Sequence, residues 1–307
     1  MDRRRALAAL FIAAASLGAS APGELPLREA RWIAPEARLK QLSTYPIPCF
    51  GKSPATLLYG VAAFRDPLLL GGQAARAGLN CGSCHRGGRG NPAFSFPGVS
   101  GQPGTADITA SLFSSHRGDG LFNPVRIPDL TYDKPKVSRT TPGALEVFIR
   151  GLIVEEFDGV EPPARVLSGM ADAIRALDAK QCEATELPAF DTDLTSFAWS
   201  IGAAEMALET GDRETVIAML RAARSALGLI AERYPEDFSA MLQRPDAEIA
   251  QIQQSLRDGE GIISVQTSLA AHKNASDAWM KPLIRSRAKS LYNPKRLAKA
   301  LNAARTP

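Results

Sequence analysis

A pentapeptide with very restricted chemistry, Cys81-Gly82-Ser83-Cys84-His85, limits the folds open to this chain. Two thiols three positions apart on one turn can bond covalently to the two vinyl groups on one side of a porphyrin. The histidine that follows is then carried beneath the ring, where a neutral imidazole nitrogen can bind iron. The pattern therefore predicts one covalent haem, attached through Cys81 and Cys84, with His85 as an iron ligand.

Other uses of a paired-cysteine motif fit this sequence less well. A thioredoxin-type dithiol needs a βαβ setting, and it does not explain His85. A structural zinc site needs four ligands, usually with a second ligand pair downstream. The remaining candidates, Cys49, Cys182, His116 and His272, are isolated along the chain. The motif therefore favours haem over a redox dithiol or zinc.

The first 21 residues have the three-part layout of a secretory signal peptide. Arginines at positions 3–5 precede an apolar run over 6–19, and the small residues Ala19-Ser20-Ala21 follow. The run is shorter than the roughly twenty apolar residues that a membrane-spanning helix needs. An uncleaved membrane anchor is the rival interpretation. We expect cleavage after Ala21 and a mature protein that is soluble in the periplasm.

Composition places the remaining chain among ordinary globular proteins. The sequence has 307 residues, of which 45% are hydrophobic and 22% charged, enough for one large or two medium domains. The formal net charge of +4 is mild and gives no reason to expect a nucleic-acid partner. Export to an oxidising compartment also predicts a disulfide between Cys49 and Cys182, the two thiols left after haem attachment.

We divide the chain into four stretches. Residues 1–21 are the signal peptide, and residues 22–50 are a proline-dotted approach segment. Residues 51–182 hold the motif and most of the glycine, and residues 183–307 have helical patterns almost throughout. Neither an internal repeat nor strand alternation stands out, so the predicted fold class is all-α.

Small polar residues and prolines mark helix starts in residues 51–182. These starts are Ser53-Pro54, Asp66-Pro67, Thr141-Pro142 and Pro162-Pro163. A further helix over 73–79 is expected to run directly into the motif. Between Arg86 and Arg139 lies a long loop rich in Gly, Pro and Ser. A loop of this length is unusual in a compact domain unless something organises it, which a haem would do.

Capping residues also divide the C-terminal stretch into helices. An apolar stripe from Leu194 to Leu208 stops at Gly211, and Asp212 is a cap for the next helix. Asp246 and Asp277 are typical of further helix starts. We therefore expect a helical C-terminal domain or extension, with no chemistry of its own that the sequence reveals.

The second axial iron ligand is not fixed by the motif. His116 lies in the loop and is free to fold over a haem face, so we predict it as the distal ligand. Met170 is the sulfur alternative, but it lies on the apolar stripe of its helix, which favours core packing. An open or water-bound site is the third possibility. Arg86 and Arg89 are candidate partners for the propionates.

Residues 68–177 resemble a haem domain of the cytochrome c superfamily. Beyond the motif, the order of parts is similar to the C-terminal haem domain of the di-haem cytochrome c peroxidase family. Those parts are Pro103-Gly104-Thr105, Ile127-Pro128-Asp129-Leu130 and a helix over 145–157. The resemblance implies a cytochrome c-like fold with long loops. That family carries two attachment motifs and this chain has one, which removes the electron-storing partner haem.

Three functions are compatible with these features. The first is a mono-haem c-type cytochrome that exchanges electrons with a redox partner protein. The second is a peroxidase-like haem enzyme with an open distal site, and the third is a haem-bearing interaction module. From Lys281 to Pro307 there are eight basic residues and no acidic one, with leucines at near-helical spacing. An amphipathic helix there would contact an anionic membrane surface or an acidic partner, or simply pack on the domain.

Overall fold

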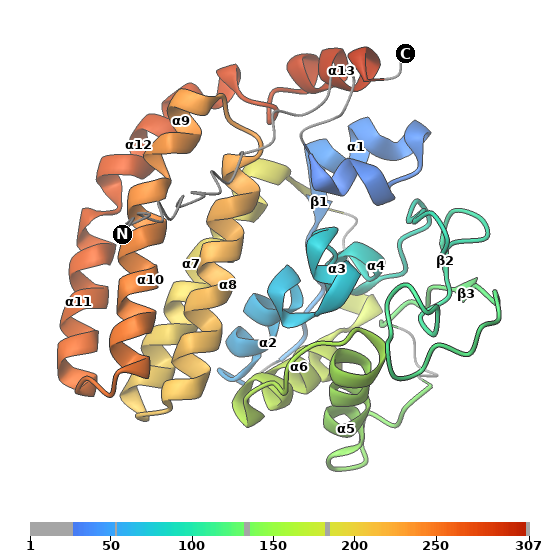
Figure 1. The fold of residues 1–307 in the computed structure, drawn as a ribbon, viewed down its shortest axis with the longest axis horizontal. Coiled ribbons are helices and arrows are strands. Elements are labelled where there is room, and N and C mark those ends of the chain that lie inside the picture. The colour runs from blue at the N-terminus through green and yellow to red at the C-terminus, as the bar shows by residue number, and fades with distance from the viewer. Residues whose placement is uncertain (1–26, 53, 132–135, 182–184, 305–307) are drawn as a thin grey trace, which may run out of the picture.

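The computed structural model describes residues 27–304, except residue 53 and residues 132–135 and 182–184. The expected signal peptide and Cys182 lie outside the described residues. Signal cleavage and the Cys49–Cys182 disulfide therefore remain predictions. The described chain is mostly helical, in agreement with the all-α expectation (Figure 1). None of its helices combines the length and the apolar character that crossing a membrane requires.

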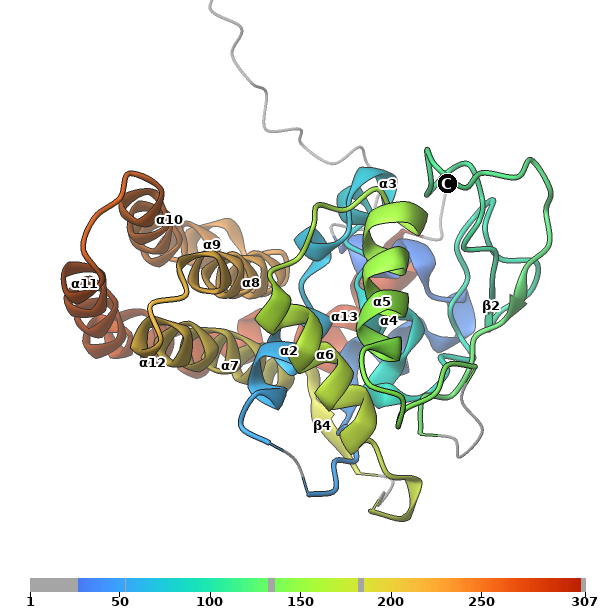
Figure 2. The ribbon, with the colours of Figure 1, turned by 90° about the horizontal axis from the view of Figure 1, so that it is seen from below.

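The helices fall into two groups along the sequence. The N-terminal group is α1 (Arg38–Ser43), α2 (Leu57–Phe64), α3 (Gly72–Arg76), α4 (Cys81–Cys84), α5 (Ala144–Gly151) and α6 (Ala164–Ala176). The C-terminal group is α7 (Ala189–Glu209), α8 (Arg213–Ala231), α9 (Glu236–Met241), α10 (Gln243–Arg257), α11 (Ile262–Ala275), α12 (Asp277–Ser286) and α13 (Pro294–Ala303). Figures 1 and 2 show the long helices α7, α8, α10, α11 and α12 on one side of the molecule. Helices α1 to α6 and the long loop lie toward the other side.

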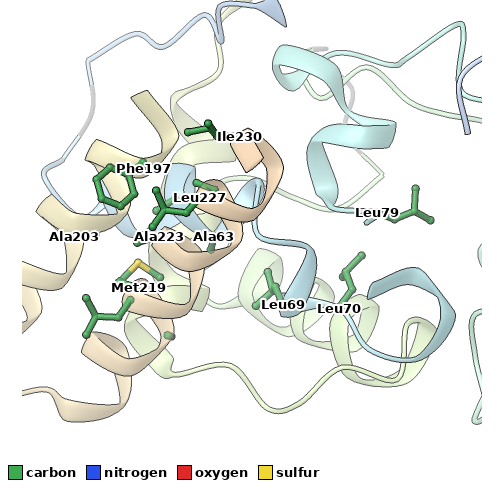
Figure 3. Packing of buried hydrophobic residues seen from close by; sticks show 14 of the residues in the cluster. Ala63, Leu69, Leu70, Leu79, Phe197, Ala203, Met219, Ala223, Leu227 and Ile230 are labelled. Atoms are coloured by element: carbon green, nitrogen blue, oxygen red, sulfur yellow. The ribbon is translucent and has the colours of Figure 1, made fainter. Parts of the chain in front are cut away.

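One hydrophobic cluster runs through both groups. It includes Leu27 and Trp32 before α1, Tyr59 of α2, Met170 of α6 and Leu227 of α8. Figure 3 shows a part of it, with side chains from α2, α7 and α8. Because α2 packs against α6, α7 and α8, residues 51–182 and residues 183–307 bury their apolar faces together.

A close helix crossing fixes α2 against α6. A Cβ atom added to Gly60 would lie 2.0 Å from the carbonyl oxygen of Gly169. The two backbones therefore touch, and only glycine at both positions allows the approach. This crossing anchors the helices on either side of the long loop.

Two short antiparallel strand pairs complete the fold. Strand β1 (Thr44–Pro46) pairs with β4 (Glu186–Pro188), with Tyr45 opposite Leu187. Strand β2 (Thr105–Ala106) pairs with β3 (Val125–Arg126) inside the long loop. Strands of two or three residues are too short to show an alternating pattern in the sequence.

The long loop has hydrogen bonds of its own besides the β2–β3 pair. The side chain of Asp107 accepts from the amides of Thr109 and Asn123, at 3.1 and 3.3 Å. Ser114 Oγ donates to the carbonyl oxygen of Glu155 at 2.6 Å, which ties the loop to the end of α5. This organisation was not expected from the sequence, because it depends on turns formed by single Asp, Ser and Thr side chains.

Several helix boundaries differ from the sequence signals. Helix α2 begins at Leu57, after the Ser53-Pro54 signal, and Asp66-Pro67 starts a single 3-10 turn, Pro67–Leu69. Helix α3 ends at Arg76, so a turn separates it from α4. A π-helix, Leu152–Glu156, extends α5. The predicted cap Asp212 is confirmed, since its side chain accepts from the Thr215 amide at the start of α8.

The basic C-terminal segment is not one continuous helix. Asn293 caps α13 and Pro294 begins it, which separates α13 from α12. Leu283, Leu297 and Leu301 are buried in the common core. These three leucines are therefore packed on the protein, while Ile284 of the same segment is 49% exposed.

Candidate functional site

The Cys-x-x-Cys-His motif forms a single helical turn, α4, held at both ends by asparagines. The Asn80 side chain and Ser83 form a reciprocal capping box, in which Ser83 Oγ accepts from the Asn80 amide at 3.1 Å. Asn91 closes the other end, since its backbone N–H donates to the carbonyl oxygen of Cys84 at 2.8 Å. These bonds satisfy backbone groups that so short a helix leaves open. The turn is thereby fixed in position.

One face of α4 is closed by the protein. A Cβ atom at Gly82 would lie 2.6 Å from the hydroxyl oxygen of Tyr45, so no larger residue fits there. The Tyr45 ring in turn contacts two guanidinium groups, with Arg65 at 4.6 Å and Arg86 at 4.5 Å from its centroid. Such cation–π contacts hold the ring against the helix. The small residues between the cysteines thus face the interior.

The other face of α4 carries Cys81, Cys84 and His85, and all three are partly exposed. Both thiols are free, with no disulfide between them. Burial of the sulfur atoms raises the pKa of Cys81 and of Cys84 to about 12. The thiols are therefore protonated at neutral pH, whereas a catalytic dithiol needs a lowered thiol pKa. A raised thiol pKa is the opposite of what a thioredoxin-type dithiol uses.

His85 is oriented by a backbone acceptor. Its Nδ1 lies 3.1 Å from the carbonyl oxygen of Pro128, which places the proton on Nδ1 and leaves the Nε2 lone pair to bind a metal. Desolvation by the surrounding protein lowers the pKa of His85 to about 4, so the imidazole is neutral at pH 7. A neutral imidazole with a fixed tautomer is the form that ligates iron.

Pro128 orients His85 through a contact that the motif spacing did not predict. It belongs to the Ile127-Pro128-Asp129-Leu130 segment that carries part of the family resemblance. Every residue has a backbone carbonyl that can accept a hydrogen bond, so the sequence does not indicate which one contacts His85. Its position 43 residues after His85 is set only by the fold of the loop.

Comparisons with protein-family models, curated proteins and solved structures find no match to this chain. The functional argument therefore rests on the motif and its surroundings.

His116, the predicted distal ligand, lies at the end of α5. Its side chain is 63% exposed, and Nε2 is 4.0 Å from Oδ1 of Asp158. The neighbouring Ser115 amide also donates to Asp158, at 2.9 Å. This loop is thus fastened to Asp158, which adopts a positive φ of 52°. Ligation by His116 stays a prediction, and the exposed imidazole is accessible for it.

Met170, the sulfur alternative, is only 2% exposed on α6 and belongs to the hydrophobic core. The stripe of its helix predicted this packing. The large apolar residues of the long loop divide into two sets. Phe94 and Phe113 are buried, while Leu121 and Phe122 are 65% and 62% exposed. The exposed pair precedes β3 and Pro128 along the chain.

Arg86 is bonded to the protein on the closed side of α4. Its guanidinium donates to the carbonyl oxygens of Gln41, at 2.8 Å, and Thr44. The Tyr45 ring stacks on the same cation, and contact of Arg86 with a propionate stays a prediction. Arg89 donates to Cys49 Sγ at 3.4 Å.

The donor set on α4 fits covalent haem better than a bare metal ion. Across the described residues, no group of three or more His, Cys, Asp or Glu side chains is arranged to hold a metal. Among the described residues, a zinc site built on Cys81 and Cys84 therefore lacks the further ligands it requires. Haem attachment needs only two thiols and one oriented imidazole, and α4 with the following His85 has these three groups.

Proposed function

We propose that this chain is a mono-haem c-type cytochrome with a cytochrome c-like domain and that it transfers electrons to or from a redox partner protein. Cys81 and Cys84 would attach the haem through thioethers, and His85 would ligate its iron. When bound, the haem supplies a one-electron couple. The observation that carries the proposal is the hydrogen bond between His85 and the Pro128 carbonyl, directly beside two free thiols.

The residues around α4 support this role in distinct ways. The Pro128 carbonyl accepts a hydrogen bond from Nδ1–H of His85, which fixes the tautomer of the imidazole. This hydrogen bond also raises the electron density of the ring, so Nε2 becomes a stronger iron ligand. The Asn80–Ser83 capping box and Asn91 keep the turn in register with His85. Tyr45 and its two arginines exclude water from the closed side. Electron transfer needs no further proton-moving residue.

The experiment that tests this proposal removes both thiols. The full chain is exported together with a haem-attachment system, and haem staining follows on a denaturing gel. We expect staining for the wild type and none for the Cys81→Ala/Cys84→Ala variant. The matched control, Cys49→Ala/Cys182→Ala, removes the same number of thiols outside the motif and should still stain. Covalent haem on the motif variant would disprove the proposal.

Optical spectra of the loaded protein test the electron-transfer function. A carrier should show a six-coordinate low-spin spectrum and reversible reduction. A high-spin spectrum together with reaction with peroxide would instead identify a haem enzyme.

The redox partner is proposed to be acidic. Lys295, Arg296 and Lys299 are exposed on α13, while the leucines of that helix are buried. The helix therefore offers charge without an apolar face, which suits a salt-sensitive protein contact better than membrane insertion. Replacing these three residues with glutamate should weaken partner binding most at low ionic strength. Equal binding by this variant would disprove the proposal.

A further inference from the structure

An apolar pocket lies between α2, α6, α7 and the β1–β4 pair. Its volume is about 130 Å³. The side chains that shape it include Val61 of α2, Ile174 of α6, Leu187 of β4 and Trp199 of α7. Three helices and one strand pair, far apart in the sequence, therefore form one concave wall.

The threonine side chains and the arginine on this wall are already bonded to the protein. Thr195 Oγ1 donates to the Asp191 carbonyl at 2.7 Å, and Thr192 Oγ1 donates to the Pro188 carbonyl at 3.2 Å. Arg65 forms an ion pair with Asp193 at 2.8 Å. A ligand would thus meet side chains whose hydrogen bonds and charge are satisfied elsewhere. Recognition has to come from apolar and aromatic contact.

The pocket is separate from the haem-attachment face. Gly87 and Gly88 line it, but Cys81, Cys84 and His85 do not. A Cβ atom at Gly88 would lie 2.6 Å from Leu177 Cδ2, so the backbone after the motif is itself part of the wall. The two pocket-lining glycines are thus the link between the attachment motif and the pocket.

We propose that this pocket binds a small, uncharged, apolar molecule about the size of one aromatic ring. An apolar cavity of about 150 Å³ is enough to hold benzene, and the volume here is close to that. A quinone or a carboxylate is disfavoured, because Thr192, Thr195 and Arg65 already bond to the protein and burying unpaired ligand oxygens costs free energy. The site goes beyond electron transfer and does not depend on haem attachment.

Benzene is the probe that tests the site, and calorimetric titration of the full mature chain is the measurement. Thr195→Leu fills the pocket from α7, and leucine is a better helix former than threonine, so the helix should persist. Ala198→Leu adds a leucine at an exposed position of the same helix and is the matched control. We expect saturable binding by the wild type and by Ala198→Leu, and loss of binding by Thr195→Leu.

A second filled variant guards against a folding defect in the first. Leu187→Phe enlarges a side chain on β4, a different wall of the same pocket. It should also lose benzene binding while keeping the wild-type far-UV spectrum. If the wild type shows no saturable binding, or both filled variants bind as the wild type does, the site is disproved.

Benzoate tests the chemical class of the ligand. It has the same ring with a carboxylate, and Arg65 is already neutralised by Asp193. We expect benzoate to bind far more weakly than benzene. Equal or tighter binding of benzoate would contradict the assignment to uncharged ligands and would make Arg65 an anion-binding residue.

Discussion

Asp193 of α7 lies among buried cations, and its replacement by asparagine tests what holds the closed side of α4. Its carboxylate is 2.8 Å from the Arg65 guanidinium and 3.9 Å from that of Arg233, and it accepts from the Tyr292 hydroxyl at 2.7 Å. Burial by itself lowers the pKa of Arg65, but attraction to Asp193 leads the effects that raise it overall. Arg65 therefore stays charged and depends on this carboxylate.

The cost of Asp193→Asn follows from the burial of these groups. The side chains of Asp193 and Arg65 are 5% and 11% exposed. Breaking a buried ion pair by removing one partner costs about 3–5 kcal/mol. Arg65 keeps neutral acceptors at Thr192 and Ser196, and Arg233 keeps Glu29 at 2.8 Å. We therefore expect the lower end, about 3 kcal/mol, or a fall in Tm of roughly 6–12 °C.

Thermal and urea unfolding of the mature protein measure this effect. The matched control is Asp246→Asn, which breaks a 2.7 Å ion pair with Arg224 whose side chains are 37% and 36% exposed. Such a pair is worth about 0–1 kcal/mol, so the control should unfold close to the wild type. If Asp193→Asn destabilises no more than Asp246→Asn, the buried network does not support α4 as we argue.

Three further predictions concern other parts of the chain. Unreduced, denatured protein should show no thiol reactive toward a labelling reagent at Cys49 or Cys182, because the expected oxidising compartment favours a disulfide between them; two labelled sites would refute the bond. His116→Ala should turn a low-spin haem spectrum high-spin, and an unchanged spectrum would rule His116 out as the distal ligand. A hydrogen bond from His272 lowers the pKa of Glu248 below 4.5, so this carboxylate stabilises the fold above pH 4.5 and the gain is lost as the pH falls through the lowered value. The Tm difference between wild type and Glu248→Gln should therefore shrink in acid, and a gap that is constant with pH would contradict this.

Local signals were enough to predict the parts of this protein that depend on neighbours in sequence. Cys81, Cys84 and His85 are joined by chain geometry, so their grouping on one turn was predictable before any tertiary contact was known. The same holds for the cap at Asp212, whose side chain reaches an amide only three residues away. The mostly helical fold was also predictable, because apolar spacing near 3.6 residues recurs through the C-terminal stretch.

Tertiary structure alone decided the features that join distant segments. The Pro128 carbonyl meets His85 across 43 residues, and Arg65 meets Asp193 across 128. The pocket combines walls from two strands and three helices. Residue types and their spacing do not predict such contacts, because carbonyl groups, charged residues and apolar residues occur throughout any sequence. Which of them come together is set by how α2, α6 and α7 pack, and that packing is a property of the whole core.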